Sequence, residues 1–497
     1  MKINETQIDN IVSRVVEEYR AKQAQQKAPV PAPSSLLPPS STLPSSLLSS
    51  SFSSSFPSST TTTGCFNSIE EAVAASKRAF SQYQEISLEQ RSKIISAIRK
   101  YAREDVSRLS QMAKDETGLG RVDDKIKKNL LAINKTPGIE DLNPTAFTGD
   151  NGLTIIEQAP YGVIGSISPC TNPSETIINN GIGMLAGGNT VVFNPHPSAK
   201  KTSAYTISLL NRAIISEGGP ANLLTTIINP TIDSAQKLMT NPDIALLVVT
   251  GGPAVVKVAM KSGKRVIAAG PGNPPVVVDE TADIEKAARD IIASASMDNN
   301  IICVLEKEII VTEKAFNPLK KALLSAGAYE LSQFHGNRLT RLLIDESGHP
   351  NKNFVGKDVQ LILGEVGLQI DTAVRLAFVE TEKYHPFAKT EMLMPILPLI
   401  RVNNIDEAIE LAYNLEAGCR HTAVIHSRNI ENMHKMAVKM NTSIFVKNGP
   451  ALAGLAFEGE GPTSFTIASP TGEGVTTARH FVRSRRCVLS NGYFRIV

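Results

Sequence analysis

The strongest chemical signal in this chain is Cys303, which follows a run of polar residues. Asp298, Asn299 and Asn300 lead into it, and these residue types favour sharp bends of the backbone. Such a lead-in can present a thiol in a cleft instead of packing it into a core. A cysteine thiolate is a nucleophile that forms covalent intermediates, so the position indicates covalent catalysis through a thioester.

The other four cysteines are expected to be small buried hydrophobic residues, which is the commoner role of an isolated cysteine. The total of five is odd, the cysteines are widely spaced, and no pair has the spacing of a metal site. This pattern favours a reduced cytosolic setting and no metal. The four are Cys65, Cys170, Cys419 and Cys487.

A second signal is Asn172, which lies in the turn Pro169–Pro173 after the apolar run Val163–Ser168. In open α/β sheets, ligands bind at the carboxyl ends of the strands. The Asn172 amide is therefore placed to donate a hydrogen bond to a developing oxyanion. An asparagine that only forms a turn or caps the next helix is the alternative, and the sequence leaves both open.

Alternating strand and helix patterns surround these residues and predict an α/β fold with a parallel sheet. Helices Ser68–Tyr83 and Leu88–Ala113 come first, and a second alternating series begins at Val276–Val278 and Asp283–Ala295. Between them, the predicted strands are Val163–Ser168, Thr190–Phe193, Leu224–Ile228, Ile244–Val249 and Arg265–Ala268, and the predicted helices are Lys200–Ser216, Ile232–Met239 and Ala254–Lys261.

The N-terminus has two parts that differ from the rest. Residues 1–27 predict an amphipathic helix, with an apolar stripe that runs from Ile8 to Tyr19. Residues 28–64 are rich in Ser, Pro and Thr and carry no charge, so we expect a disordered, flexible tether. The tethered helix is expected to dock onto a partner, and a coiled-coil or oligomer tail is the alternative.

Composition restricts the class of protein. The 497 residues are 42% apolar and 20% charged, with a net charge of +3 and no tryptophan. These values predict neither a nucleic-acid surface nor a platform for base stacking. No apolar run is long enough to span a membrane, and the N-terminal segment lacks the apolar region of a secretory signal.

Seven motifs in one order resemble the aldehyde dehydrogenase superfamily, specifically its coenzyme-A-acylating branch, over roughly residues 65–497. The resemblance implies a Rossmann-type dinucleotide-binding domain (65–143 and 161–267), an α/β catalytic domain (268–475) and small oligomerisation strands (144–160 and 476–497). The motifs are Pro160–Gly165, Thr171–Pro173, Val192–Pro197, Thr250–Gly252, Gly270–Pro274, the Cys303 segment and Glu391–Pro395.

The same resemblance assigns roles to individual residues. It makes Cys303 the nucleophile and Asn172 the oxyanion donor, with NAD as the oxidant and coenzyme A as the co-substrate that collects the acyl group. The implied cofactor-binding residues are Ser168, Pro169, Asn194, Pro195, Thr250, Gly251, Gly252, Gly270, Pro271, Glu391 and Leu393.

Departures from the hydrolytic relatives indicate the product. Those relatives have Glu where this chain has Ala268, Lys where it has Asn194, and an aromatic residue where it has Leu393. Without a carboxylate at 268, water is poorly activated, whereas a thiol needs much less help to attack a thioester. Because this chain has Asn194 in place of that Lys, we expect weaker binding of the cofactor. Weaker binding favours release of the reduced cofactor before coenzyme A binds.

The resemblance extends to enzymes packaged in bacterial microcompartments, which often carry such a helix and tether. It implies a homo-oligomeric enzyme that converts propionaldehyde to propionyl-coenzyme A in 1,2-propanediol degradation, bound to shell or cargo proteins through residues 1–27. An acetaldehyde dehydrogenase of an ethanolamine pathway is the near alternative, since one methylene is worth only about 1–3 kcal/mol. A hydrolytic aldehyde dehydrogenase and a non-catalytic packaging protein are the more distant ones.

Deletion of residues 1–27 is expected to leave aldehyde oxidation unchanged and to abolish co-assembly, because the tether separates this segment from the predicted catalytic fold. Turnover of the purified protein and its co-sedimentation with shells would measure the two properties separately. Lost activity together with intact packaging would contradict this division of labour.

Overall fold

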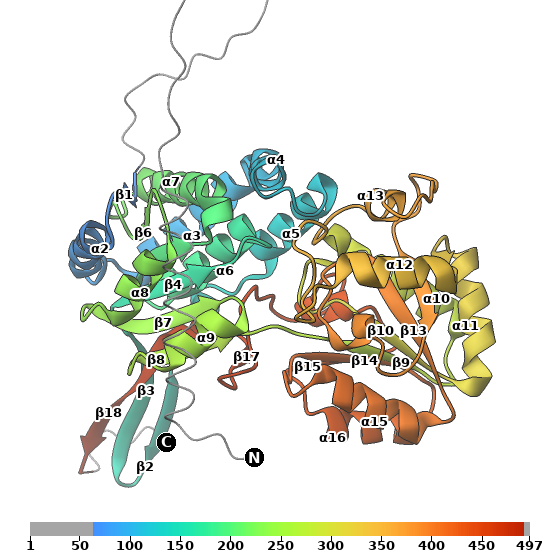
Figure 1. Cartoon of the computed structure of the whole chain (residues 1–497). Helices are drawn as coiled ribbons and strands as arrows, with labels where there is room; N and C mark the ends of the chain where they lie inside the picture. The colour runs from blue at the N-terminus through green and yellow to red at the C-terminus, as the bar shows by residue number, and fades with distance from the viewer. Residues whose placement is uncertain (1–62, 492–497) are drawn as a thin grey trace, which may run out of the picture. The chain divides into compact units, whose positions relative to one another are not determined.

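The computed structural model describes residues 63–491 (Figure 1). The predicted helix at 1–27, residues 28–62 of the predicted tether and residues 492–497 of the predicted terminal strand lie outside the described residues. None of the helices within 63–491 is long and apolar enough to cross a membrane.

The first sheet has six parallel strands in the order β1-β6-β5-β4-β7-β8. The chain runs from β4 to β5 and β6 on one side and continues with β7 and β8 on the other, so the order reverses between β4 and β7. Nucleotides bind at such a switch point in open α/β sheets. The five predicted strands are confirmed; the observed strands are β1 Cys65–Phe66, β4 Val163–Ser168, β5 Thr190–Pro195, β6 Leu224–Ile227, β7 Ile244–Thr250 and β8 Arg265–Ala269.

Helices cover both faces of this sheet because its strands are apolar on both sides. Ile164 and Val191 belong to one core cluster, and their sequence neighbours Val163 and Val192 belong to another. Alternate residues of a strand face opposite sides, so both faces are buried. Helices α3 Leu88–Glu104, α6 Pro173–Ala186 and α7 Lys200–Ser216 contribute to the first cluster, and α2 Ile69–Tyr83, α8 Ile232–Thr240 and α9 Pro253–Met260 to the second.

One predicted helix is wrong, because Leu88–Ala113 is two helices, α3 and α4 (Val106–Thr117). Asp105 separates them, with φ −105° and ψ 11°. Its carboxylate accepts a hydrogen bond from the Tyr205 hydroxyl of α7 at 2.5 Å. This tertiary contact holds the break, and nothing in the local pattern announces it.

The second sheet begins after the first ends, so the chain changes sheets between Ala269 and Pro275. Its seven strands are parallel and lie in the order β11-β12-β13-β10-β9-β14-β15. They are β9 Pro275–Val278, β10 Glu308–Thr312, β11 Tyr329–Leu331, β12 Ala377–Thr381, β13 Ile396–Val402, β14 Thr422–His426 and β15 Ile444–Lys447.

Helices also cover both faces of the second sheet. α10 and α11 join the large cluster that also contains the first sheet's side chains, whereas α15 and α16 pack in a separate cluster on the other face. One continuous apolar core therefore links the two sheets. The remaining helices are α5 Val122–Lys135, α10 Ile284–Ala295, α11 Glu313–Ser325, α12 Gln333–Leu343, α13 Val359–Gly364, α14 Pro386–Lys389, α15 Ile405–Glu416 and α16 Ile430–Met440.

A third, antiparallel sheet has the order β18-β3-β2 and joins the two segments predicted as oligomerisation strands. β18 (Val482–Ser490) pairs with β3 (Gly152–Pro160) along its whole length, and β3 pairs with β2 (Thr145–Gly149). Phe147 and Val488 are each 58% exposed. The role of these strands in assembly stays a prediction.

The last predicted part of the catalytic domain returns to the first sheet. β16 (Ile467–Ala468) and β17 (Gly474–Val475) form a small antiparallel pair. The Thr471 hydroxyl between them accepts a hydrogen bond from the Ala268 N–H of β8 at 3.0 Å. The segment therefore borders the place where the chain leaves the first sheet.

Asn189 ties together the elements around β4. Its Oδ1 accepts hydrogen bonds from the N–H groups of Tyr161 at 2.7 Å and Gly162 at 3.1 Å. Its Nδ2 donates to the carbonyl oxygens of Met184 at 3.1 Å and Phe481 at 2.8 Å. Since Asn189 is fully buried, water cannot replace these partners.

The substitution Asn189→Ala is expected to lower the free energy of unfolding by about 3 kcal/mol, because it leaves buried backbone groups unpaired. Thermal unfolding followed by circular dichroism would measure the loss. Asn143→Ala is the control, because it removes one exposed hydrogen bond to the Glu140 carbonyl oxygen and should cost under about 0.5 kcal/mol. Equal melting temperatures for the two variants would contradict the expectation.

Candidate active site

The turn before Cys303 consists of three consecutive residues in the left-handed conformation. Asp298, Asn299 and Asn300 have φ of 48°, 56° and 66°. Asp and Asn tolerate this conformation better than other residues with a side chain, and such strain persists only where surrounding contacts impose it. The polar lead-in identified in the sequence is therefore a strained turn that ends at Asn300, three residues before Cys303.

Side-chain hydrogen bonds hold this turn from several directions. Asn299 Nδ2 donates to the carbonyl oxygen of Gly356 at 3.0 Å. Asn300 Nδ2 donates to the carbonyl oxygen of Ala295, at the end of α10, at 2.8 Å. The Lys307 ammonium donates to Asn300 Oδ1 at 2.6 Å. Each of the two asparagines thus has a structural reason for its residue type.

Cys303 is partly buried, and its surroundings keep the sulfur protonated. Burial, together with the negative charge of Glu391, raises the pKa of the Cys303 thiol to about 12. Burial also raises the pKa of the Glu391 carboxyl to about 7 and lowers the pKa of the Lys307 ammonium to about 8. The resting sulfur is therefore a neutral thiol near groups that titrate close to neutral pH.

Asn172 lies four residues after the end of β4, at the position that precedes the first residue of α6. It does not cap this helix with its side chain. Its Oδ1 accepts a hydrogen bond from the Lys128 ammonium at 2.7 Å, and its Nδ2 donates to the Thr171 hydroxyl at 3.2 Å. Asn172 therefore occupies the cap position of α6 without a capping hydrogen bond from its side chain, and the choice between a turn residue and an oxyanion donor stays open.

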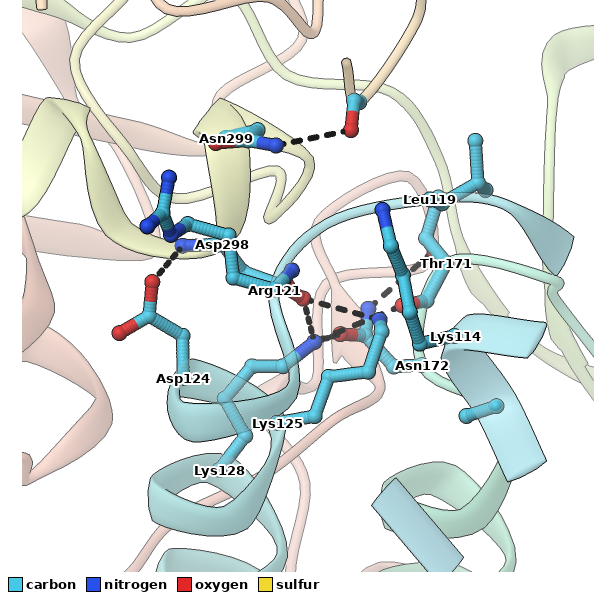
Figure 2. Close-up of polar contacts among 12 residues, drawn as sticks. Lys114, Leu119, Arg121, Asp124, Lys125, Lys128, Thr171, Asn172, Asp298 and Asn299 are labelled. Carbon is cyan, nitrogen blue, oxygen red and sulfur yellow. Dashed lines mark hydrogen bonds and ion pairs between the residues drawn. The ribbon is translucent and has the colours of Figure 1, made fainter. Parts of the chain in front are cut away.

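A buried ionic cluster connects Asn172 to the Cys303 turn (Figure 2). Lys128 Nζ lies 2.5 Å from Asp298 Oδ2 and 3.3 Å from Glu175 Oε1, and Lys125 Nζ lies 3.1 Å from the same Asp298 oxygen. All four side chains are nearly inaccessible to solvent. We call Lys125, Lys128, Glu175 and Asp298 the ionic cluster.

Seven of the predicted cofactor-binding residues lie together at the carboxyl ends of three adjacent strands. They follow or end β4, β5 and β7, and Ser168 of β4 is opposite Pro195 of β5. Thr250 ends β7, and Gly251 and Gly252 lead into the N-terminus of α9. These seven are Ser168, Pro169, Asn194, Pro195, Thr250, Gly251 and Gly252.

Asn194 is at this edge, but its side chain is engaged. It is buried, and its Oδ1 accepts a hydrogen bond from the Ser234 hydroxyl of α8 at 2.6 Å. The residue thus helps to fix α8 against β5. The expected weaker hold on the cofactor at position 194 stays a prediction.

The remaining predicted residues lie where the chain passes between the sheets. Gly270 and Pro271 follow β8, and Glu391 Oε1 accepts a hydrogen bond from the N–H of the nearby Gly272 at 3.4 Å. Leu393 has φ of 53°, and its carbonyl oxygen accepts a hydrogen bond from the Gly356 N–H at 2.9 Å. Glu391 and Leu393 therefore border the Cys303 turn, whereas Gly270 and Pro271 continue from the carboxyl edge of the first sheet at β8.

His421 was not identified as a site residue from the sequence. It is buried just before β14, and burial and the charge of Lys307 lower its pKa to about 4. A side-chain Cβ built on Gly272 would lie 2.8 Å from His421 Cγ and 2.9 Å from the Cys303 carbonyl oxygen. His421 Nε2 has no hydrogen-bond partner among the described residues and Nδ1 lies 2.9 Å from the Thr422 hydroxyl, so a neutral imidazole lies close to the Cys303 turn.

Lys128 was also missed, because its position in an amphipathic helix is typical of a solvated charge. Only the three-dimensional contacts bring it to Asn172. Within residues 63–491, no three His, Cys, Asp or Glu side chains are grouped so that they could hold a metal ion.

Comparison with known proteins gives a consistent relationship. The aldehyde dehydrogenase family model matches residues 58–333 and 372–466. An acetylating acetaldehyde dehydrogenase from Salmonella typhimurium is 52% identical over 440 residues, which cover 87% of this chain and 94% of that protein.

Two solved structures are similar over most of their length. A propionaldehyde dehydrogenase from Rhodopseudomonas palustris, with bound CoA and an acylated cysteine, is 46% identical with a TM-score of 0.85, covering 86% of this chain and 98% of that one. A propionaldehyde dehydrogenase from a fucose utilisation bacterial microcompartment of Clostridium phytofermentans is 48% identical with a TM-score of 0.85 and the same coverage.

The substitution Glu391→Gln is expected to speed alkylation of Cys303. It removes a negative charge that raises the thiol pKa, so more thiolate is present at a given pH; burial, the larger cause, remains. Above about pH 7, where the wild-type Glu391 carboxyl is ionised, reaction with iodoacetamide is expected to be roughly threefold faster, and below that pH the difference should vanish. The pH profile of alkylation, with adduct at Cys303 identified by mass spectrometry, would measure it.

Glu410→Gln is the matched control for this prediction. Glu410 is 57% exposed and pairs with Lys439, so its removal should leave the Cys303 profile unchanged. A Glu391→Gln profile that coincides with the control, or moves to higher pH, would contradict the assigned sign.

Proposed function

This chain belongs to the aldehyde dehydrogenase family as an acylating member, and we propose that it oxidises propanal with NAD and coenzyme A to propionyl-coenzyme A. The observation that carries the proposal is a partly buried thiol whose preceding turn is linked through Lys128 to the Asn172 amide, with alanine at position 268. Ala268 is fully buried in β8 and offers only a methyl group, so it cannot activate water. Acyl transfer to a thiol is thereby favoured over hydrolysis.

The first sheet fits a nicotinamide dinucleotide in two respects. Ser168 Oγ, at the end of β4, is buried and has no partner among the described residues, so a ligand hydroxyl or phosphate would satisfy it. A Cβ built on Gly252 would meet nothing within 4 Å, which leaves the N-terminus of α9 open to a diphosphate. Ser168, Thr250, Gly251 and Gly252 would hold the group there. The bound nicotinamide supplies the acceptor for the aldehyde hydride.

The first chemical step belongs to Cys303. The Cys303 thiol first gives up its proton, which we assign to the nearby Glu391 carboxylate, and the thiolate then attacks the aldehyde carbonyl carbon; a sulfur–carbon bond forms and the carbonyl electron pair moves onto oxygen. The free N–H of the Asn172 amide is the donor that we assign to this oxyanion. Loss of hydride then leaves an acyl thioester on Cys303, at the oxidation level of the product.

The second step exchanges one thioester for another. The coenzyme A sulfur attacks the acyl carbon, the bond to Cys303 breaks, and the thiolate is restored. We assign the proton of the incoming thiol to His421, because its Nε2 has no partner among the described residues. An aldehyde dehydrogenase that forms a free acid would need an activated water in this step instead.

Acetaldehyde is the second candidate substrate, and a specific observation favours it. The acetylating relative from Salmonella typhimurium is 52% identical to this chain, against 46% and 48% for the two propionaldehyde dehydrogenases. Residence in a bacterial microcompartment is part of the proposal. It is supported by the Clostridium phytofermentans enzyme of such a compartment and by the helix and tether predicted at residues 1–64.

The purified full chain supplied with propanal, NAD and coenzyme A is expected to reduce the cofactor and to form propionyl-coenzyme A. Absorbance would follow cofactor reduction and mass spectrometry would identify the product. Cys303→Ser should lower turnover by at least about 10³-fold, because a serine hydroxyl is a far weaker nucleophile at neutral pH. The ratio of kcat/KM for propanal and acetaldehyde decides between the two substrates.

Other outcomes would overturn parts of the proposal. Free propionate as the main product would exclude acyl transfer and would point to Glu391, which is near Cys303 and half ionised near pH 7, as the base for water. Acylation of coenzyme A by Cys303→Ser at the wild-type rate would exclude the covalent route.

A further inference from the structure

Lys128 contacts the side chain of Asn172 in addition to the two carboxylates that balance its charge. Its side chain is nearly inaccessible, and its ammonium donates to Asn172 Oδ1 at 2.7 Å as well as pairing with Asp298 and Glu175. Burial lowers the pKa of Lys128, but the charges of Asp298 and Glu175 outweigh this effect and leave the pKa above its usual value. The group is thus a permanent cation.

Donor and acceptor chemistry fixes the direction of the Asn172 amide. An ammonium carries three donors and no acceptor, so only the oxygen of the amide can face Lys128. The amide nitrogen must then point away from Lys128. One of its two N–H groups donates to the Thr171 hydroxyl at 3.2 Å, which leaves one N–H for an oxyanion. A cation on the amide oxygen also polarises this N–H and strengthens it as a donor.

The same ammonium reaches the nucleophile turn. Its partner Asp298 is the first of the three left-handed residues before Cys303, and Asp298 Oδ1 accepts a hydrogen bond from the Arg121 N–H at 2.6 Å. Figure 2 shows Lys128 of α5 between Asn172 and the Asp298 turn. One cation therefore contacts both the side chain that we assign to the oxyanion and the turn that carries the sulfur.

We propose that Lys128 is a positioning residue for the reaction, which orients the Asn172 amide toward the oxyanion and sets its register with the Cys303 turn. The proposal rests on the proposed function, because that function gives Asn172 an oxyanion to stabilise. Lys125 lies in the same ionic cluster and bonds Asp298, but within the described residues it has no bond to Asn172. Lys125 is therefore a natural control.

The test uses the full chain and a charge-balanced double variant, Lys128→Met with Glu175→Gln. Together these changes remove one cation and one anion and leave the Lys125–Asp298 pair intact, so the buried charge stays balanced. We expect a fall in kcat of about 10²-fold with a smaller change in KM, as for loss of an oxyanion donor. Melting temperature and circular dichroism show whether the variant is folded.

Combining the double variant with Asn172→Ala distinguishes a positioning role of Lys128 from a general disturbance of the structure. If Lys128 acts through the Asn172 amide, adding the two substitutions of the double variant to Asn172→Ala lowers kcat little further, because the amide is already absent. Lys125→Met, the control, should combine with Asn172→Ala so that the two fold-losses multiply. Fold-losses that multiply for Lys128 as they do for Lys125 would overturn the proposal, and so would full turnover in the double variant.

A crystal structure of the double variant gives a readout that does not depend on turnover. The Asn172 amide is expected to rotate away from its wild-type orientation, and an amide that stays in place overturns the positioning role. If the amide rotates but wild-type protein forms no acyl-coenzyme A, the positioning holds and the proposed function is what fails.

Discussion

The candidate site depends on four charges that are removed from water. Burying a lone lysine or carboxylate costs several kcal/mol, and only close, well-directed partners offset this cost. Lys125 and Lys128 of α5 meet Asp298 and Glu175, so two cations balance two anions with distances of 2.5–3.3 Å. Such a cluster tolerates few alternative arrangements, because moving any member leaves another unpaired. Asn172 and the Cys303 turn, which contact this cluster, are therefore held in fixed positions.

The electrostatics around the sulfur suit a reaction that must begin only when its reactants are bound. Cys303 rests as a thiol with a pKa of about 12, and Glu391, with a pKa of about 7, contributes to that value. A stored thiolate would be open to oxidation and alkylation, whereas a protonated sulfur is less reactive toward both. Glu391 and Lys307 titrate near neutral pH. They lie close enough to Cys303 that a change in their charge changes the pKa of the thiol.

The strands and the chemically unusual residues could be predicted from the sequence. The contacts between segments that are far apart in the sequence could not. Strands buried on both faces have continuous apolar runs, so the sequence predicts β4 to β8. It also predicts the bend before Cys303, because Asp and Asn favour such bends. Lys128 and His421 have ordinary sequence surroundings, and their importance arises from neighbours far along the chain. The break at Asp105 was hidden for the same reason, since Tyr205 holds it.

The ionic cluster also bears on how the protein is made. Lys125 and Asp298 are separated by 173 residues, so the cation is synthesised long before its partner. Until the second half of the chain folds, α5 must keep these lysines solvated and cannot pack in its final place. The link between α5 and the Cys303 turn can therefore form only after both of these distant segments have been synthesised.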